Sequence, residues 1–147
     1  MSIKFYKTTD EYGAFSNFSR YGFELDGEYW ATSEHYFQAQ KFSDMELRRK
    51  IQNAKTPMEA AQAGRNRNNL LRDDWEEIKV AIMKKAILQK FMSHNDLKAL
   101  LLSTGTEEII EENTADYYWG CGKDGTGKNV LGKLLMEIRE ELRKHYP

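Results

Sequence analysis

The sequence predicts a mainly α-helical α+β domain with a small antiparallel β element near the N-terminus. Two observations carry this prediction. Six segments show helical periodicity or helix-capping residues, and they follow one another along most of the chain. One pair of short β-like runs stands before the first of them. Strands and helices do not alternate, so the pattern is not that of a parallel α/β sheet.

The first thirty residues supply the predicted hairpin. Residues 3–6 form a short β-like run, and residues 10–18 are rich in aromatic side chains but have no regular period, which predicts a loop. The runs 21–25 and 28–30 then flank Asp26-Gly27. Asp-Gly between two such runs is a strong signal for a tight hairpin turn.

Helical patterns occupy most of the remaining chain. The expected helices cover residues 31–42, 44–53, 57–63, 74–92, 95–102 and 129–144. Gly64 is expected to cap the third helix at its C-terminal end. The fourth helix is apolar over a wide arc, which predicts a central place in the core. Residues 107–111 are expected to form a short strand, and residues 113–129 a loop.

The composition is that of an ordinary soluble protein. Of the 147 residues, 40% are hydrophobic and 31% charged, and the net charge of −1 gives no support to binding of duplex nucleic acid. The single cysteine, Cys121, excludes an internal disulfide and suits a reducing compartment. Neither a signal peptide nor an apolar run of membrane-spanning length is recognisable. We therefore expect one domain over residues 1–147, cytoplasmic and without membrane contact.

The first predicted helix carries an unusual polar stripe. Glu34, Gln38 and Lys41 are spaced so that all three project from one side. A stripe of this kind is usually a solvated helix face. Here it is flanked by many aromatic side chains, namely Tyr29, Trp30, Tyr36, Phe37 and Phe42. A polar stripe walled by aromatic rings is typical of a pocket for a flat or sugar-like ligand.

The glycine-rich segment 119–132 contains weak matches to two nucleotide-binding motifs. Gly122 and Gly127-Lys128 have the spacing of a phosphate-binding loop, but Asn129 stands where that loop needs Ser or Thr. Both motifs also require a βαβ unit, which the sequence does not predict. A glycine-rich loop before a helix can still offer backbone N–H groups to a phosphate.

Glu34 and Asp116 are the best candidates for acid–base chemistry. Each lies beside aromatic residues, and burial against aromatic rings raises the pKa of a carboxyl group. Two carboxylates with a stacking ring suit cleavage of a glycosidic bond. A desolvated Lys41 could attack an aldehyde-like sugar carbon and form a Schiff base. The structural alternatives, a turn residue for Asp116 and a surface amine for Lys41, stay open at this point. No His/Cys cluster has metal-ligand spacing.

Read together, several motifs resemble the NADAR family of YbiA-like proteins, over about residues 5–143. The segments that carry the resemblance are Phe15-Ser-Asn-Phe18, Trp30-x-x-x-Glu34-His-Tyr-Phe-Gln-Ala-Gln-Lys41-Phe42, Gly64-Arg65, Trp75-x-x-x-Lys79-x-x-x-Met83, Lys90-Phe91, Glu111…Asp116-x-x-Trp119-Gly-x-Gly122 and Gly127-x-Asn129-x-Leu131-Gly132-x-x-Leu135-Met136-x-x-Arg139. The blocks around Glu34 and Trp119 are the most specific. One departure is the short loop between Gly122 and Gly127.

The resemblance implies a YbiA-like fold and an N-glycosidase that needs no cofactor or metal. The bond cut in this family joins ribose C1 to an exocyclic amine of a base. The implied catalytic residues are Glu34, Lys41 and Asp116. The expected substrate-binding residues, which combine the family motif with the pocket and stacking hypotheses, are Phe18, Trp30, Tyr36, Gln38, Arg65, Trp119, Gly120, Gly122 and Asn129.

Two substrate classes and two non-enzymatic alternatives are open at this point. We expect removal of ADP-ribose from guanine in single-stranded nucleic acid, with a cognate ADP-ribosyltransferase toxin as a partner. The first alternative is hydrolysis of phosphoribosylamino-pyrimidine intermediates of riboflavin synthesis. The second is a module that binds ADP-ribose or NAD without cutting it. A purely helical interaction domain without a pocket is a further alternative.

Overall fold

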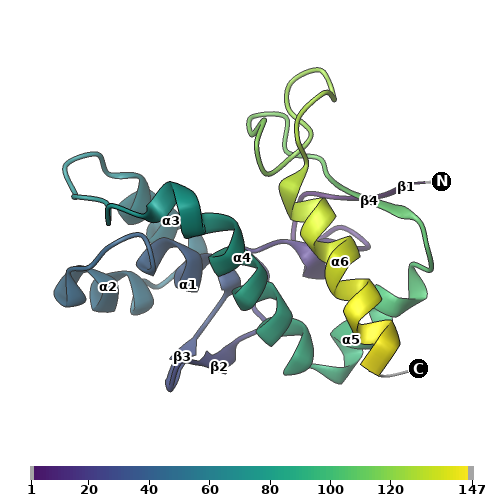
Figure 1. The fold of residues 1–147 in the computed structure, drawn as a ribbon, viewed down its shortest axis with the longest axis horizontal. Coiled ribbons are helices and arrows are strands. Elements are labelled where there is room, and N and C mark those ends of the chain that lie inside the picture. The colour runs from purple at the N-terminus through teal and green to yellow at the C-terminus, as the bar shows by residue number, and fades with distance from the viewer. Residues whose placement is uncertain (1, 146–147) are drawn as a thin grey trace. The chain divides into compact units, whose positions relative to one another are not determined.

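The computed structural model describes residues 2–145 (Figure 1). Its elements are β1 (Ser2–Phe5), β2 (Phe23–Leu25), β3 (Glu28–Trp30), α1 (Ser33–Ala39), α2 (Met45–Gln52), α3 (Pro57–Arg65), α4 (Trp75–Met92), α5 (Asn95–Ser103), β4 (Glu108–Glu111) and α6 (Val130–His145). The mainly helical α+β fold is thereby confirmed. The described residues form two compact units, one of residues 17–93 and one of residues 2–16 and 94–145.

The predicted hairpin is present and has the expected turn. β2 and β3 pair antiparallel, with Phe23 opposite Trp30 and Leu25 opposite Glu28. Asp26 and Gly27 both have positive φ, 55° and 79°. Two consecutive residues with positive φ are what a tight two-residue hairpin requires, because this turn matches the right-handed twist of the strands.

A second strand pair was not predicted as a pair. β1 and β4 run parallel, with Phe5 opposite Glu111. Both segments were expected to be extended, but their sequences carry no information about each other. Parallel strands need a long connection, and here most of the chain lies between them.

The predicted end of α3 was wrong. The helix continues through Gly64 to Arg65, so Gly64 is not its cap. Gly64 lies inside the helix, at a position where α3 packs closely on α1. A Cβ at position 64 would overlap the side chain of Gln38, which is itself buried. The glycine is therefore needed for the close approach of two helices.

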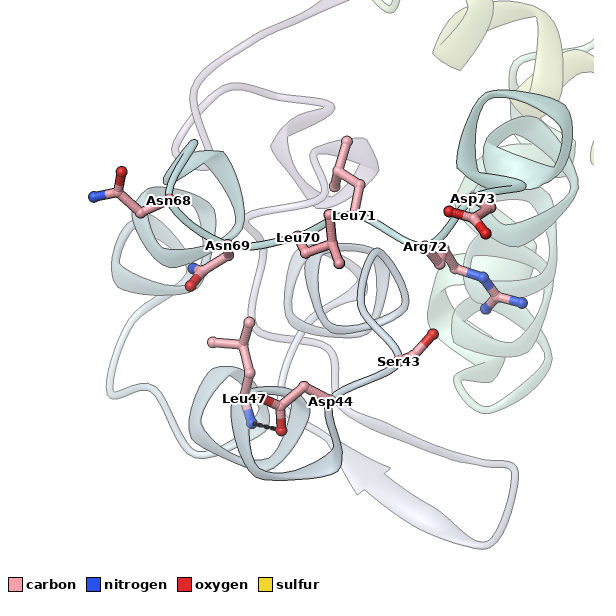
Figure 2. Close-up of a pocket in the computed structure, with 9 residues that line it drawn as sticks. All are labelled: Ser43, Asp44, Leu47, Asn68, Asn69, Leu70, Leu71, Arg72 and Asp73. Atoms are coloured by element: carbon pink, nitrogen blue, oxygen red, sulfur yellow. Dashed lines mark hydrogen bonds between the residues drawn. The ribbon is translucent and has the colours of Figure 1, made fainter.

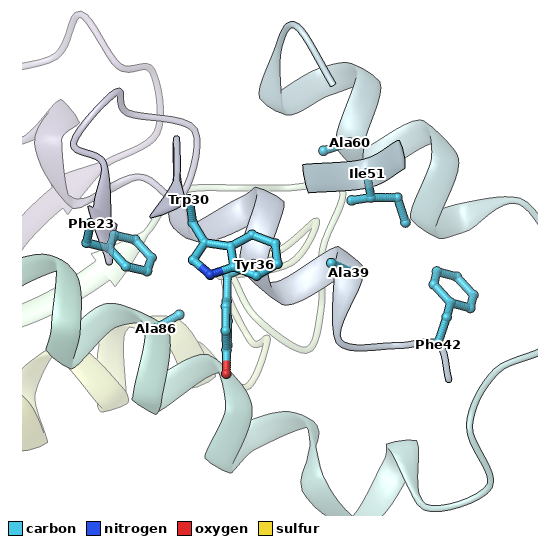
Figure 3. Packing of buried hydrophobic residues seen from close by; sticks show 8 residues of the cluster. All are labelled: Phe23, Trp30, Tyr36, Ala39, Phe42, Ile51, Ala60 and Ala86. Carbon is cyan, nitrogen blue, oxygen red and sulfur yellow. The ribbon is translucent and has the colours of Figure 1, made fainter. Parts of the chain in front are cut away.

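The core of the 17–93 unit surrounds α1. Figure 3 shows eight buried side chains of this cluster, which come from β2, β3, α1 to α4 and the turn after α1: Phe23, Trp30, Tyr36, Ala39, Phe42, Ile51, Ala60 and Ala86. All seven residues of α1 are buried. A helix without a solvent-facing side must find internal partners for every polar side chain it carries.

The N-terminus of α1 meets this requirement through His35. The Thr32 hydroxyl caps the helix by accepting the backbone N–H of His35, at 3.1 Å. The His35 ring lies between the Thr32 hydroxyl, 2.7 Å from Nδ1, and the Ala54 carbonyl oxygen, 3.0 Å from Nε2. Burial lowers the pKa of His35, although the Ala54 carbonyl opposes this shift. A neutral ring that donates through Nε2 and accepts at Nδ1 fits both contacts.

In the other unit, α6 lies against β4. A Cβ at Gly132 would overlap the carbonyl oxygen of Ile109 in β4. The Asn129 side chain joins the same two elements, because its amide donates to the Ile109 carbonyl and its oxygen accepts the Glu111 N–H. The predicted packing stripe of α6 is buried, with Leu131, Leu134, Leu135, Ile138 and Leu142 all in the core. No helix among residues 2–145 is both long and apolar enough to cross a bilayer.

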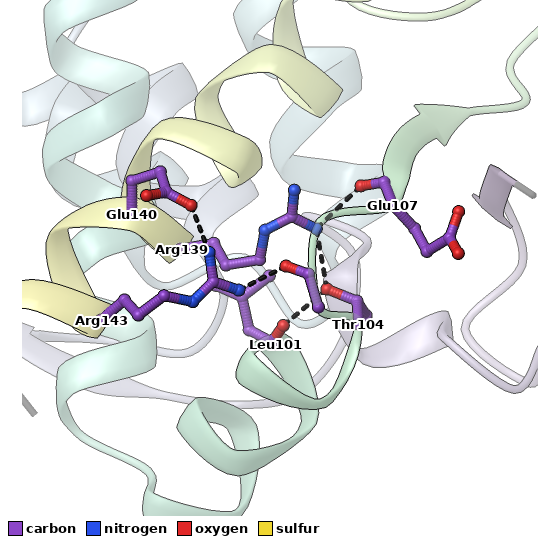
Figure 4. Close-up of polar contacts among 7 residues, drawn as sticks. Leu101, Thr104, Glu107, Arg139, Glu140 and Arg143 are labelled. Carbon is purple, nitrogen blue, oxygen red and sulfur yellow. Dashed lines mark hydrogen bonds and ion pairs between the residues drawn. The ribbon is translucent and has the colours of Figure 1, made fainter. Parts of the chain in front are cut away.

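A buried guanidinium ties α6 to the segment between α5 and β4 (Figure 4). Arg139 is 4% exposed and donates from Nη1 to the Thr104 hydroxyl at 2.9 Å and to the Glu107 carbonyl at 2.8 Å. Arg143 pairs with Glu140 at the surface beside it. Arg139 therefore supplies a hydrogen-bond donor to two oxygens of the turn after α5.

Replacing Arg139 with methionine should lower the free energy of unfolding by about 2 kcal/mol, because the Thr104 and Glu107 acceptors lose their donor. Urea denaturation of the purified variant measures this. Lys133→Met, an exposed substitution on the same helix, is the control and should change stability by less than about 0.5 kcal/mol. Equal stabilities for both variants would contradict the structural role given to Arg139.

Candidate functional site

The polar stripe of α1 lies inside the protein. Glu34 is 6% exposed and Gln38 3% exposed, and the Gln38 amide donates to Glu34 Oε2 at 2.7 Å. Lys41 follows in the turn after the helix and is half-buried, with Nζ 3.4 Å from the Gly64 carbonyl oxygen. The solvated-face interpretation is therefore wrong for this stripe. A carboxylate, an amide and an amine lie along one buried helix edge.

One hydrogen-bond acceptor of Gln38 has no partner. Its Oε1 atom is buried and has no hydrogen-bond partner among the described residues. With the amide nitrogen committed to Glu34, this oxygen faces the segment around Gly64. An unpaired buried carbonyl oxygen costs about 1–3 kcal/mol, so a donor supplied at this position would be favourable.

The surroundings of Lys41 favour its neutral form. Burial lowers the pKa of the Lys41 amine. The positive charges of Arg65 and Lys79 lower it further, whereas the negative charges of Glu34 and Glu76 act against this effect. A neutral amine is a nucleophile, whereas an ammonium group is not.

Aromatic rings bound Lys41 on one side. Its Nζ lies 5.8 Å from the centre of the Phe37 ring, and that ring packs against Trp75 with 5.1 Å between the centres. Lys79 follows Trp75 by one helical turn and pairs with Glu76 at 2.8 Å. Lys79 was not among the predicted site residues. The signal that could have found it is its i+4 spacing from Trp75, which places the two on one face of α4.

The loop before β2 is fixed against α1 and α4. The Asn17 carbonyl accepts the Glu34 N–H at 3.2 Å, and the Asn17 side-chain oxygen accepts the Ser33 hydroxyl at 2.8 Å. Two residues later, the buried amine of Lys90 donates to the Ser19 hydroxyl at 2.9 Å. Complete burial lowers the pKa of Lys90 to about 7. Phe18, a predicted stacking residue, is half-buried between these two anchored positions.

Two predicted substrate-binding residues belong to the core instead. Trp30 is 1% exposed and Tyr36 0% exposed, and their rings pack edge to face with 5.1 Å between centres (Figure 3). The Tyr36 hydroxyl donates to Asp26 at 2.8 Å, and burial raises the pKa of this phenol well above its usual range. Side chains without accessible surface cannot stack on a ligand in this structure, which corrects both predictions.

The predicted residues Asp116 and Trp119 lie in the other unit. Asp116 Oδ1 accepts the backbone N–H groups of Tyr118, at 3.0 Å, and Trp119, at 2.8 Å. The Trp119 ring is half-buried and packs edge to face on Tyr118. Asp116 thus fixes the turn that carries these two rings. Its alternative role as a turn residue explains the contacts of one of its two carboxylate oxygens, Oδ1.

The glycine-rich segment folds back on itself. The Gly127 N–H donates to the Cys121 carbonyl, and the Asn129 N–H donates to the Gly120 carbonyl at 2.9 Å. Gly122 has a φ of 73°, which favours glycine. Gly122 also lines a cavity of about 720 Å³ beside Tyr117. The Asn129 side chain is occupied by β4, so its predicted contact with substrate does not fit this structure.

The predicted site residues thus fall into two groups. Glu34, Gln38 and Lys41 are together in the 17–93 unit, with the charge of Arg65 acting on Lys41. Asp116, Trp119, Gly120, Gly122 and Asn129 are together in the other unit. Within residues 2–145, no three His, Cys, Asp or Glu side chains are grouped in a way that could hold a metal ion.

Comparison with known proteins confirms the resemblance stated above. The NADAR domain family matches residues 4–143. The chain is 51% identical to the N-glycosidase YbiA of Escherichia coli over 140 residues, which covers 95% of this chain and 88% of that protein. The solution structure of E. coli YbiA matches with a TM-score of 0.89 and 49% identity, over 99% of this chain and 88% of the other.

A further relative is a larger protein, of which this chain matches one part. The riboflavin biosynthesis protein VVA0006 of Vibrio vulnificus is 39% identical over 145 residues, which covers 99% of this chain but 40% of that protein. The family match covers nearly the whole chain, and relatives of similar length are about half identical to it. The chain therefore belongs to the NADAR domain family.

Proposed function

We propose that this protein is an N-glycosidase that hydrolyses the bond between a ribose C1 and an exocyclic amine of a base. The observation that carries the proposal is the Lys41 amine, which is half-buried, has a pKa below the ordinary 10.5 and lies near the Glu34 carboxyl group. The relatives named N-glycosidases support the reaction class.

The proposed reaction proceeds through an imine on Lys41. The protonated Glu34 carboxyl group gives its proton to the ring oxygen and becomes a carboxylate, and the ribose ring opens to an iminium between C1 and the amine of the base. Lys41 Nζ attacks C1 and passes a proton to the departing amine by way of the carboxylate. The C1–N bond to the base breaks as the C1–Nζ imine forms. Water then hydrolyses the imine, which frees Lys41 and the ribose aldehyde. A role for Asp116 as a second acid–base group stays a prediction.

For the substrate we favour ADP-ribose attached to guanine in single-stranded nucleic acid, with a cognate ADP-ribosyltransferase toxin as its source. Arg65, the last residue of α3, and Arg67, two residues later, support this choice, because both are exposed and offer two cations to a diphosphate. The Vibrio relative favours a second candidate, the phosphoribosylamino-pyrimidines of riboflavin synthesis. Parallel turnover assays on both substrates decide between them. Binding of ADP-ribose without turnover of either would indicate a non-catalytic module.

Borohydride added during turnover should trap the sugar on Lys41, because an imine is reduced to a stable amine. Mass spectrometry of the digested protein would locate the adduct. Lys41→Ala should form no adduct and lose nearly all activity, while Lys50→Ala, an exposed control on α2, should behave as the unmodified protein. A Lys41→Ala variant with full turnover would exclude the covalent role.

The rate should fall as the pH drops through the lowered pKa of Lys41, because protonation removes the nucleophile. This pKa lies below the ordinary 10.5. Lys79→Gln removes one of the charges that lower it, so the acidic limb of the pH–rate profile should move to higher pH. Lys50→Gln should leave the profile in place. An unshifted profile in Lys79→Gln would contradict the influence of Lys79 on Lys41.

Glu34→Gln should reduce turnover by about 100-fold or more, since an amide cannot transfer the protons that the reaction needs. Its affinity for the released sugar should change little, because glutamine keeps the size of the side chain and can still bond to Gln38. Single-turnover kinetics and calorimetry measure the two quantities. Full activity in this variant would assign Glu34 to structure alone.

A further inference from the structure

Two features of the 17–93 unit lie outside the proposed mechanism, a cavity and a buried lysine. The cavity, of about 510 Å³, lies between the start of α2 and the connection from α3 to α4 (Figure 2). Arg72 is among its lining residues, but neither Glu34 nor Lys41 is. The buried lysine is Lys90 of α4, which contacts the same loop that binds the Glu34 backbone. Lys90, and not the cavity, is therefore connected with the proposed site.

The Lys90 side chain is buried to an extent that is rare for lysine. It is 1% exposed, and its Nζ lies 5.7 Å from the centre of the Phe91 ring. Removing an ammonium group from water costs free energy of folding, and an apolar side chain of similar length would avoid this cost. Packing alone would therefore favour an apolar residue at this position. A buried lysine here indicates a role for the amine itself.

The amine attaches one end of the loop before β2 to α4. Lys90 Nζ donates to the Ser19 hydroxyl at 2.9 Å. Two residues earlier in the loop, the Asn17 amide donates to the sulfur of Met83 at 3.4 Å. Met83 and Lys90 are seven residues apart, so they lie two turns apart on one side of α4. Both ends of this short segment are thus attached to the same face of α4.

The loop also completes the N-terminal end of α1. The first N–H groups of a helix have no partners within it, and all seven residues of α1 are buried away from water. The Thr32 hydroxyl accepts one of these N–H groups, and the Asn17 carbonyl accepts that of Glu34 at 3.2 Å. The Asn17 side chain accepts the Ser33 hydroxyl at 2.8 Å. The loop that Lys90 attaches to α4 therefore determines the position of the Glu34 backbone.

We propose that Lys90 is a positioning residue that keeps the Glu34 carboxyl group in place for the glycosidase reaction. It acts through Ser19 and the loop before β2, and it does not touch the substrate. The inference rests on the proposed function, because it treats Glu34 as the group that transfers protons. Catalysis is sensitive to such placement, since a displacement of about 1 Å can lower a rate by about 100-fold.

The test replaces Lys90 with methionine, which is similar in length but cannot donate to Ser19. Lys90→Met should fold, because it no longer buries an amine. The matched control is Lys85→Met on the same helix, which removes an exposed amine that pairs with Asp26. In steady-state kinetics we expect Lys90→Met to lower kcat about tenfold with a much smaller change in KM. Lys85→Met should leave both constants unchanged.

A second variant, Ser19→Ala, removes the same hydrogen bond from its acceptor side. Its kcat should also fall. The double variant Lys90→Met/Ser19→Ala should be no slower than Lys90→Met, because one contact is lost in all three proteins. If the two losses multiply in the double variant, Lys90 does not act through Ser19, and the proposal is overturned.

Hydrogen exchange of the Glu34 amide, followed by NMR without substrate, measures the attachment of the loop directly. Exchange should be faster in Lys90→Met than in the unmodified protein and unchanged in Lys85→Met. Unchanged exchange in Lys90→Met, or an unchanged kcat, overturns the role of Lys90 and leaves the proposed function intact. An unmodified protein that turns over neither substrate overturns the proposed function, and the positioning role with it, whatever the exchange rates are.

Discussion

The complete burial of α1 is the constraint on which the 17–93 unit depends. A seven-residue helix with no solvent-facing side carries Ser33, Glu34, His35, Tyr36 and Gln38, and each of these polar side chains must be paired inside the protein. The pairing groups come from every neighbouring segment: the loop before β2, the hairpin turn and the α2–α3 connection. The polar residues of α1 therefore determine how the segments around it are arranged.

The packing around α1 also lowers the pKa of Lys41, which follows the end of the helix. Lys41 leaves α1 where the buried stripe meets α3, and the absent side chain of Gly64 lets the two helices come close. The amine is thereby desolvated, and the two nearby cations add to the effect. Burial of a lysine costs free energy of folding. The cost is offset by the packing of α1, and the pKa of the amine lies below that of a surface lysine.

Helix positions and the hairpin could be predicted from the sequence because their signals are local. Caps, the Asp26-Gly27 turn and apolar periodicity all act within a few residues. The pairing of β1 with β4 could not, because neither strand encodes its distant partner. Gly64 was misjudged for the same reason: a glycine near a helix end predicts a cap unless the neighbouring helix is known. The six helices follow from local rules, whereas their close contacts depend on the tertiary fold.

The aromatic residues around the stripe show which feature of a site cannot be predicted from sequence spacing. Spacing placed Trp30 and Tyr36 near Glu34, which is correct, but it could not tell a pocket wall from a core. Tyr36 is turned inward because Asp26 offers an acceptor, and Asp26 is held in turn by Lys85 of α4 at 2.8 Å. Phe37 instead lies against the Lys41 amine, and Phe18 is half-buried. Which ring of an aromatic cluster remains available to a ligand is thus decided by the hydrogen bonds that fix the others, and those bonds join residues far apart in the chain.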